Sequence, residues 1–411
     1  MKRLLLLLFL GTTLVTAQQF NHVVIVIQEN RTPDNLFSAC LIPGADLVQV
    51  GSAVPLAVPY DLGHTHSSYQ QNAKGKWSSK SKGYVQASNV QPYCQLANQG
   101  GFANRMFQTN QGPSYPAHQF LFGGTSALSP TSTTLASENT QGLSGCNAPA
   151  SSTVPTILPN GLPGPLVPPC FEHQTLSDLL DAAHLSWLYY AAPGEVYGGI
   201  WVAPNSINHI CAPLKFGKKL LCTGTDWGKI VYNPPQVLTD IQNCKLSNVS
   251  WVTPAGAYSD HAVANNGSGP AWVASIVNAV LTQPTCSNGE TYWQNTAILI
   301  TWDDWGGWYD HVPPLPNNTA FCTSYCYGFR VPLLVVSSYT PAGYVDNNVH
   351  DFGSILKFVE TNFNLGLIGS GTYADAYADN LGEFFTGSQA PWAWIAAPKA
   401  SFSDLSDPDD D

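Results

Sequence analysis

Two apolar runs in this chain each lead directly into oxygen-bearing side chains. The first run covers residues 22–28 and the second covers residues 296–302. Aliphatic and β-branched runs bounded by polar turns predict strands buried on both faces, as in the centre of an α/β domain. The side chains that follow the two runs are Glu29, Asn30, Asp303 and Asp304. Because ligands collect at the carboxyl ends of such strands, we expect these four side chains to converge on one divalent cation.

Strand-like and helix-like segments alternate along the rest of the chain. Further strands are predicted at residues 185–191, 249–253 and 331–337, and helices at residues 172–184, 271–282 and 351–365. Strands that alternate with helices indicate a mostly parallel central sheet flanked by helices. The predicted fold class is therefore α/β.

Two segments, residues 40–100 and 127–170, are rich in Ser, Thr, Gly, Pro and Asn and show little periodicity. We predict that they are long ordered loops pinned by cysteines rather than linkers. No charge run or repeat marks a domain boundary, so residues 18–400 are predicted to form a single domain. Residues 401–411, which end in Asp-Pro-Asp-Asp-Asp, are predicted to be an acidic, solvated tail.

The N-terminal residues 1–17 have a charged start, an apolar middle and a small-residue exit. This pattern is typical of a secretory signal peptide and predicts an extracellular or periplasmic protein. No later stretch reaches the roughly 18 to 20 apolar residues that a membrane-spanning helix needs. Without Lys2 and Arg3, 14 basic residues remain against 27 acidic ones, a formal charge of −13. Such an acidic balance argues against nucleic acid as a partner.

Ten cysteines form an even set, which favours disulfides in an exported protein. Sequence does not fix the pairing, but Cys211 with Cys222 and Cys146 with Cys170 would close the shortest loops. The pair Cys322 and Cys326 has the spacing of half a zinc site, yet no second Cys/His pair stands near it. Disulfide bonding is the better interpretation of these two residues.

Ser114 is the candidate nucleophile. It follows Gly112-Pro113 and precedes a predicted helix over residues 117–123. The start of a helix offers N–H groups and a positive dipole end, which favour an alkoxide or a phosphate. A helix cap is the common role of a serine in this position, and only the surrounding groups argue for more.

Histidines that could manage protons occur at several places. His64 and His66 lie in one loop, and His261 follows Asp260, while His209 and His311 stand singly. A histidine pair in a loop can approach an anion or a metal, although exposed histidines without a role are common. His311 follows the Asp303–Asp304 segment closely and could line the same pocket or cap a loop.

Four segments in order resemble a bacterial phosphoesterase family that joins acid phosphatases to phosphatidylcholine-hydrolysing phospholipases C. They are Val24 to Phe37, Gly112 to Pro116, Trp251 to His261, and Ile300 to Pro314. The resemblance implies an alkaline-phosphatase-like core. It also implies that Glu29, Asn30, Asp303 and Asp304 hold a metal ion with the Ser114 hydroxyl, and that His64 and His261 line the phosphate pocket. His209, in Ile207-Asn-His-Ile210, matches the family more loosely.

The predicted function is metal-dependent hydrolysis of phosphoric esters through a serine nucleophile, of the acid phosphatase or phospholipase C type. The cofactor would be one divalent ion, with Ca²⁺, Mg²⁺, Mn²⁺, Zn²⁺ and Fe all left open. The substrate would be a small phosphate ester or a phospholipid head group. One alternative is an inactive exported protein that keeps the metal for stability. Sulfate or phosphonate hydrolysis ranks lower, because Ser114-Tyr-Pro-Ala-His118 lacks the Arg of the sulfatase pattern.

Overall fold

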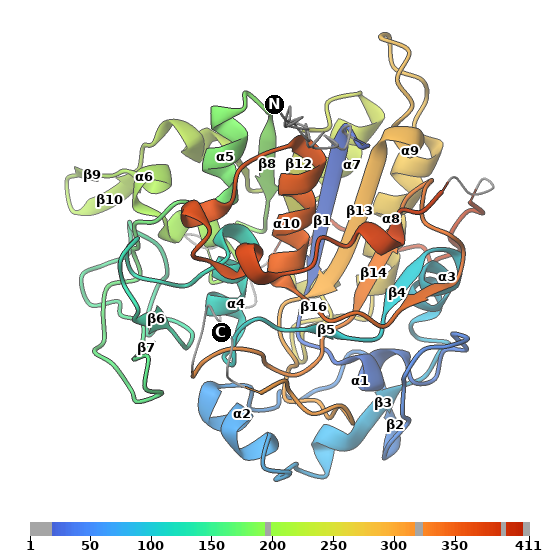
Figure 1. Ribbon diagram of the computed structural model, residues 1–411, viewed down its shortest axis with the longest axis horizontal. Helices are drawn as coiled ribbons and strands as arrows, with labels where there is room; N and C mark the ends of the chain where they lie inside the picture. Colours follow the sequence, from blue (N-terminus) through green and yellow to red (C-terminus); the bar gives the residue numbers. More distant parts are fainter. Residues whose placement is uncertain (1–18, 194–198, 317–323, 388–391, 406–411) are drawn as a thin grey trace, which may run out of the picture.

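An eight-stranded sheet forms the centre of the computed structural model (Figure 1), which describes residues 19–193, 199–316, 324–387 and 392–405. The strands lie in the order β11 (Ile230–Val231), β8 (Trp187–Tyr190), β12 (Val249–Val252), β1 (His22–Gln28), β13 (Thr296–Trp302), β14 (Leu333–Val336), β4 (Gly101–Ala103) and β15 (Tyr344–Asp346). The predicted signal peptide lies outside the described residues.

The sheet is mixed, and β14 runs against both of its neighbours. The other neighbouring strands pair in parallel. The α/β class and the mostly parallel sheet are confirmed, with strand β14 as the exception. A parallel neighbour needs a crossover, usually a helix, and the described part of the chain between β13 and β14 contains none.

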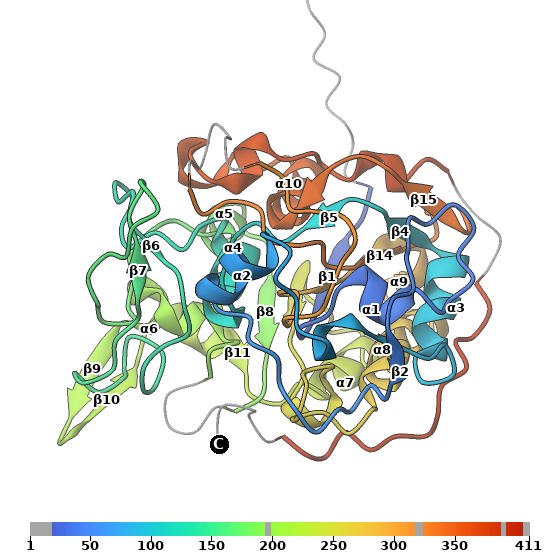
Figure 2. The same ribbon diagram turned by 90° about the horizontal axis from the view of Figure 1, so that it is seen from below.

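Ten α-helices surround the sheet. They are α1 (Pro33–Phe37), α2 (His66–Asn72), α3 (Gln91–Gln99), α4 (Ser114–Gly123), α5 (Leu176–Ala182), α6 (Asn208–Cys211), α7 (Gln236–Gln242), α8 (Gly269–Thr282), α9 (Tyr292–Asn295) and α10 (Phe352–Phe363) among the described residues. Figure 2 shows α4, α5 and α10 on one side of the sheet and α7 and α8 on the other. Both central strands, β1 and β13, are therefore buried along their whole length, as their apolar sequences predict.

Among the described residues, four two-stranded sheets lie outside the centre. They pair β2 (Ser52–Val54) with β3 (Gly83–Val85), β5 (Met106–Phe107) with β16 (His350–Asp351), β6 (Leu135–Ala136) with β7 (Thr156–Ile157), and β9 (Pro213–Phe216) with β10 (Lys219–Cys222). The segment 40–100 also contains α2 and α3, so its prediction as a loop was wrong in part. In α3 the apolar residues Tyr93, Leu96 and Ala97 share one buried face, a pattern that the polar composition around them conceals.

Disulfides brace the long segments. The bonds Cys146–Cys170 and Cys211–Cys222 are both present, as the sequence suggests, with Cys40–Cys94 and Cys244–Cys286 beside them. Cys326 is also disulfide-bonded, which excludes it as a zinc ligand; Cys322 lies outside the described residues.

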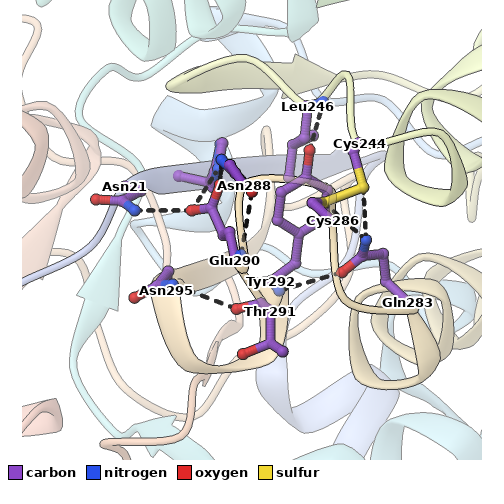
Figure 3. The surroundings of a disulfide bond; sticks show 11 residues. Asn21, Cys244, Leu246, Gln283, Cys286, Asn288, Glu290, Thr291, Tyr292 and Asn295 are labelled. Carbon is purple, nitrogen blue, oxygen red and sulfur yellow. Dashed lines mark hydrogen bonds and ion pairs between the residues drawn. A yellow bond between two sulfur atoms is a disulfide. The ribbon is translucent and has the colours of Figure 1, made fainter.

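The bond Cys244–Cys286 joins the end of α7 to the segment before β13 (Figure 3). Gln283 Nε2 lies 2.9 and 3.0 Å from the two sulfurs, and Gln283 Oε1 accepts from Tyr292 N (3.3 Å). This network fixes the chain that enters β13.

The described part of the predicted tail is not fully solvated. Phe402 packs against Tyr258 and Trp272, with ring centroids 5.3 and 5.1 Å away. Residues 406–411 lie outside the described residues.

Candidate active site

Parallel pairing of β1 with β13 brings the predicted metal ligands to one edge of the sheet. Gln28 lies opposite Trp302, and Asp303 N donates to Gln28 O over 3.0 Å. One residue further on, Asn30 N donates to Asp303 Oδ1 over 3.1 Å. The side chains of Asp303 and Asp304 are fully buried. Two neighbouring carboxylates in a buried position repel each other unless a cation lies beside them.

A tight turn after Asp304 holds Asn30 in place. Asn30 has a φ of 59°, a left-handed conformation that asparagine tolerates better than most residues. Gly306 also has a positive φ (59°), and a Cβ added there would lie 2.2 Å from Asn30 O. Gly306 N donates to Asp304 Oδ1 over 2.6 Å. The turn therefore packs its backbone directly against Asn30, and only glycine fits.

Ser114 is the first residue of helix α4, and its hydroxyl donates to Asp304 Oδ2 over 3.4 Å. It does not cap the helix, since Pro113 occupies the cap position. The expectation that the helix start would offer several N–H groups to a phosphate was wrong. Tyr115 N donates to Asn139 Oδ1 (3.0 Å), and Pro116 carries no N–H. The contact with Asp304 is therefore the observation that supports Ser114 as the candidate nucleophile.

His64 faces Asn30 from the loop before α2. Its Nδ1 lies 2.7 Å from Leu62 O, and its Nε2 lies 3.2 Å from Asn30 Nδ2. Because a backbone carbonyl holds Nδ1–H, Nε2 is directed into the site. Burial by itself lowers the pKa of His64, but the carboxylates of Asp304 and Asp61 outweigh it and raise the pKa to about 9. His64 therefore carries a positive charge when no cation is bound.

His261 stands beside His64, with 6.1 Å between the ring centroids. Its Nδ1 lies 2.6 Å from Ala262 O, so that its Nε2 is the nitrogen left for chemistry. Burial lowers the pKa of His261 and outweighs the opposing charge of Asp61, and the nearby charge of His64 lowers the pKa further. Arg31 supports this loop through a 2.9 Å bond from Nε to Asp260 O. A neutral His261 next to a charged His64 suits a division between proton transfer and charge stabilisation.

His118 belongs to the same cluster, although sequence reasoning missed it. Its Nε2 lies 2.9 Å from Glu29 Oε1, and both side chains are fully buried. Donor atoms of Glu29, His118 and Asp303 lie within 4.8 Å of one another. Burial lowers the pKa of His118 to about 4, so it is neutral at pH 7. The signal was its spacing: His118 is four residues after Ser114 and shares its face of the helix.

The donor atoms of this cluster fit a divalent cation. Asp303 Oδ2 and Asn30 Oδ1 are buried and have no hydrogen-bond partner among the described residues. A buried oxygen without a partner is costly unless an ion or water satisfies it. Together with Asp304 and Ser114, these atoms form the oxygen-rich set that Mg²⁺, Mn²⁺ or Ca²⁺ prefers, while His118 would also suit Zn²⁺ or Fe.

A cavity of about 570 Å³ lies beside the cluster and is lined by Ser114, His64 and His261. Its outer wall includes Glu138, a residue without any local sequence signal. The neighbours of Glu138 both contact the Ser114 segment: a Cβ on Gly112 would lie 2.3 Å from Ser137 O, and Asn139 accepts from Tyr115 N. Burial raises the pKa of Glu138 to about 7. A carboxyl group that titrates near neutrality thus faces the cavity.

The other three histidines named as candidates in the sequence do not line this cavity. His209 does not line the cavity; it lies between Glu172 (2.7 Å) and Asp178 (3.1 Å) at the surface, and its predicted catalytic role gains no support. His66 Nδ1 lies 3.2 Å from Gln111 O. His311 does not line the cavity either and contacts Asp34 (2.7 Å).

Comparison with known proteins agrees with this geometry. A model of the Phosphoesterase family matches residues 49–366, which is most of the chain. The chain belongs to the Phosphoesterase family.

Relatives of this Phosphoesterase chain include bacterial phospholipases C. The hemolytic phospholipase C of Pseudomonas aeruginosa is 22% identical over 415 residues, covering 85% of this chain and 53% of the relative. The non-hemolytic phospholipase C of Burkholderia pseudomallei is 32% identical over 146 residues, covering 30% of this chain and 20% of the relative. Two of the relatives match most of this chain. In each case the chain spans only about half of the relative's length. A solved alkaline phosphatase superfamily protein from Vibrio parahaemolyticus has a TM-score of 0.41 at 10% identity, covering 90% of this chain and 71% of its own.

The Gly306 turn gives a direct test of how the predicted metal ligands are positioned. We expect Gly306→Ala to displace Asn30 and to lower the affinity for a divalent ion roughly 10- to 100-fold, as loss of a supporting contact does at metal sites. Isothermal titration calorimetry of metal-stripped protein measures this. Gly217→Ala is the matched control, because Gly217 has a similar φ (61°) with open space around it. Equal affinities in the two variants would contradict the proposed packing role.

Proposed function

We propose that this protein is an exported, metal-dependent phosphoric ester hydrolase in which Ser114 is the nucleophile. The observation that supports this most strongly is the contact of Ser114 with Asp304 in a buried acidic cluster at the wall of a cavity that also contains two histidines. Membership of the Phosphoesterase family and the phospholipase C relatives support the same reaction class. The disulfides support export, and no described helix has the length and apolarity to cross a membrane.

The ion would be held by Glu29, Asn30, Asp303 and Asp304 together with the hydroxyl of Ser114. When bound, a divalent cation there would lower the pKa of the Ser114 hydroxyl and draw charge from a phosphoryl oxygen. Its identity among Ca²⁺, Mg²⁺, Mn²⁺, Zn²⁺ and Fe is a matter for metal analysis of the purified protein.

The steps follow from the residues around the cavity. Ser114 Oγ attacks phosphorus, the bond from phosphorus to the alcohol oxygen breaks, and a phosphoserine forms. Neutral His261 accepts the proton of the Ser114 hydroxyl as it attacks and donates this proton to the leaving oxygen; it then accepts a proton from the water that hydrolyses the phosphoserine and returns it to Ser114 Oγ. His64, in its protonated form, stabilises negative charge on the phosphoryl oxygens. The products are the alcohol and the released phosphate group, with Ser114 regenerated.

The substrate class is tested with three esters: p-nitrophenyl phosphate, bis(p-nitrophenyl) phosphate and phosphatidylcholine vesicles. Hydrolysis of any of them that requires a divalent ion supports the proposal, and the preferred ester separates a phosphatase from a phospholipase C. Metal-dependent stability with no hydrolysis of the three would instead favour a binding protein that keeps the ion for structure.

His261→Ala should lower turnover by roughly 10²- to 10⁴-fold, the usual contribution of general acid–base catalysis. Metal affinity should stay unchanged, because within the described part of the chain His261 makes no hydrogen bond or ion pair with a predicted ligand. His209→Ala is the control, since His209 is held by Glu172 and Asp178 at the surface. If His209→Ala reduced turnover as strongly as His261→Ala, the placement of the proton-transfer group would be wrong.

A further inference from the structure

The hairpin of β9 and β10 projects from the edge of the molecule (Figures 1 and 2). Its strands pair in antiparallel register and are joined by Gly217 and Lys218. Gly217 has a φ of 61°, as the first position of a tight type II′ turn requires, and an added Cβ would meet nothing within 4 Å. The tip of the hairpin therefore stands clear of the rest of the protein.

One face of this hairpin carries three exposed apolar side chains beside Lys219. Leu214 and Phe216 alternate along β9 and so share a face, and Leu221 lies opposite Leu214 on β10. Their side chains are 55%, 55% and 39% exposed. Single exposed apolar residues are common on soluble proteins, but a projecting apolar face indicates a binding surface.

Lysines lie close to the three apolar residues: Lys219 is paired with Phe216 on the same face, Lys218 is in the turn, and Lys215 is on the opposite face. Lys215, Lys218 and Lys219 are all exposed and account for three of the 16 basic residues in a chain with a net charge of −11. No Asp or Glu occurs in residues 201–225. Among the described residues, the lysine ion pairs involve Lys229 and none of these three. The hairpin is thus a positively charged point on an acidic protein.

A disulfide closes the base of the hairpin, and the chain that leads to it lines the cavity. The disulfide Cys211–Cys222 closes it, and Thr223 N donates to Cys211 O over 2.7 Å. Eleven residues before Cys211, Ile200 lines the cavity that contains Ser114. An isolated two-stranded hairpin is only marginally stable in water, so the disulfide preserves a shape that packing does not support.

We propose that the β9–β10 hairpin binds an anionic lipid surface, with Leu214, Phe216 and Leu221 inserted among the lipids and the three lysines on their phosphate groups. Apolar side chains combined with lysines are the pattern that binds such interfaces. Three apolar side chains offer too little area for a stable protein–protein interface, which buries roughly 1,200 Å² or more. This inference goes beyond the proposed hydrolase activity and does not depend on it.

Vesicle co-sedimentation of the full chain tests the proposal, with phosphatidylcholine vesicles that contain or lack phosphatidylglycerol. The wild type should bind the anionic vesicles, and added salt should weaken the binding. Both the double variant Leu214→Ser/Phe216→Ser and the triple variant Lys215→Gln/Lys218→Gln/Lys219→Gln should lower the partition coefficient about tenfold or more. None of these changes touches the disulfide, and unchanged thermal melting confirms that each variant folds.

Two controls separate the hairpin from other causes. Leu41 is 90% exposed and lies beside α3, on the opposite side of the molecule from the hairpin (Figures 1 and 2), so Leu41→Ser should bind like the wild type. Ser114→Ala should also bind like the wild type, which distinguishes a failure of the hydrolase proposal from a failure of this one. No binding by the wild type, or equal binding by the hairpin variants, would overturn the proposal.

Discussion

Ser114→Ala should reduce hydrolysis of the preferred phosphate ester by roughly 10⁴-fold or more, because loss of a nucleophile removes the covalent route altogether. Folding should be almost unaffected, since the Ser114 hydroxyl makes one long hydrogen bond of 3.4 Å to Asp304. Steady-state kinetics and thermal melting measure the two effects. A variant that retained most of the activity would refute the nucleophile assignment.

The control for this experiment is Ser250→Ala. Ser250 is fully buried in β12, and its hydroxyl has no hydrogen-bond partner among the described residues. The same atom is thus removed from an equally buried position away from the cavity. Both activity and melting temperature should stay close to the wild type. Trapping of a phosphoserine in the wild type but not in Ser114→Ala would add a chemical readout.

Asp304→Asn should destabilise the protein when the metal is bound but not when the metal is removed. Burial, and next the charge of Asp303, raise the pKa of Asp304 well above its ordinary value. An acid whose pKa is raised by folding stabilises the fold at low pH, and this stability is lost as the pH rises through the raised pKa. The metal-free wild type at neutral pH therefore carries an electrostatic cost that asparagine removes. Without metal, the variant should melt at the same temperature as the wild type or higher.

With metal bound, the wild type should melt at a higher temperature than the variant. Ligand binding stabilises the folded state by about 2.7 kcal/mol at a free-ion concentration of 100 times Kd, and the variant has lost a charged ligand. Its activity should fall by roughly 10³-fold, since the cation supplies several kcal/mol of transition-state stabilisation. Asp240→Asn, a buried acid that accepts from Tyr190 Oη (2.8 Å), should show neither effect. Melting curves with and without EDTA measure the reversal, and a variant less stable in both conditions would contradict it.

The sequence could predict the strands that carry the metal-binding edge because each is a continuous apolar run. The bounds of β1 and β13 agree with the predicted runs, and β8, β12 and β14 fall within theirs. An apolar run does not indicate the direction of its strand in the sheet, so the antiparallel β14 was missed. The segment between β13 and β14 had no helical pattern, and this was the signal that could have predicted it.

Residues next to a predicted strand end or helix start were also accessible to sequence reasoning. The structure brings Asn30, Asp303, Asp304 and Ser114 together because each lies within two residues of such an end. Their roles as ligands and nucleophile stay predictions for the experiments above. The loop residues were less predictable: His64 and His261 reach the cavity, whereas His209 does not.

By itself, the sequence determined the local features of this protein: which segments are buried strands, and which polar side chains follow them. These depend on the burial of consecutive residues, which a pattern of apolar positions records. Only the tertiary structure decided that His118 reaches Glu29, that Glu138 faces the cavity and that the β9–β10 hairpin stands free. Those positions depend on how loops distant in sequence pack against the sheet edge, and no local pattern specifies such long-range contacts.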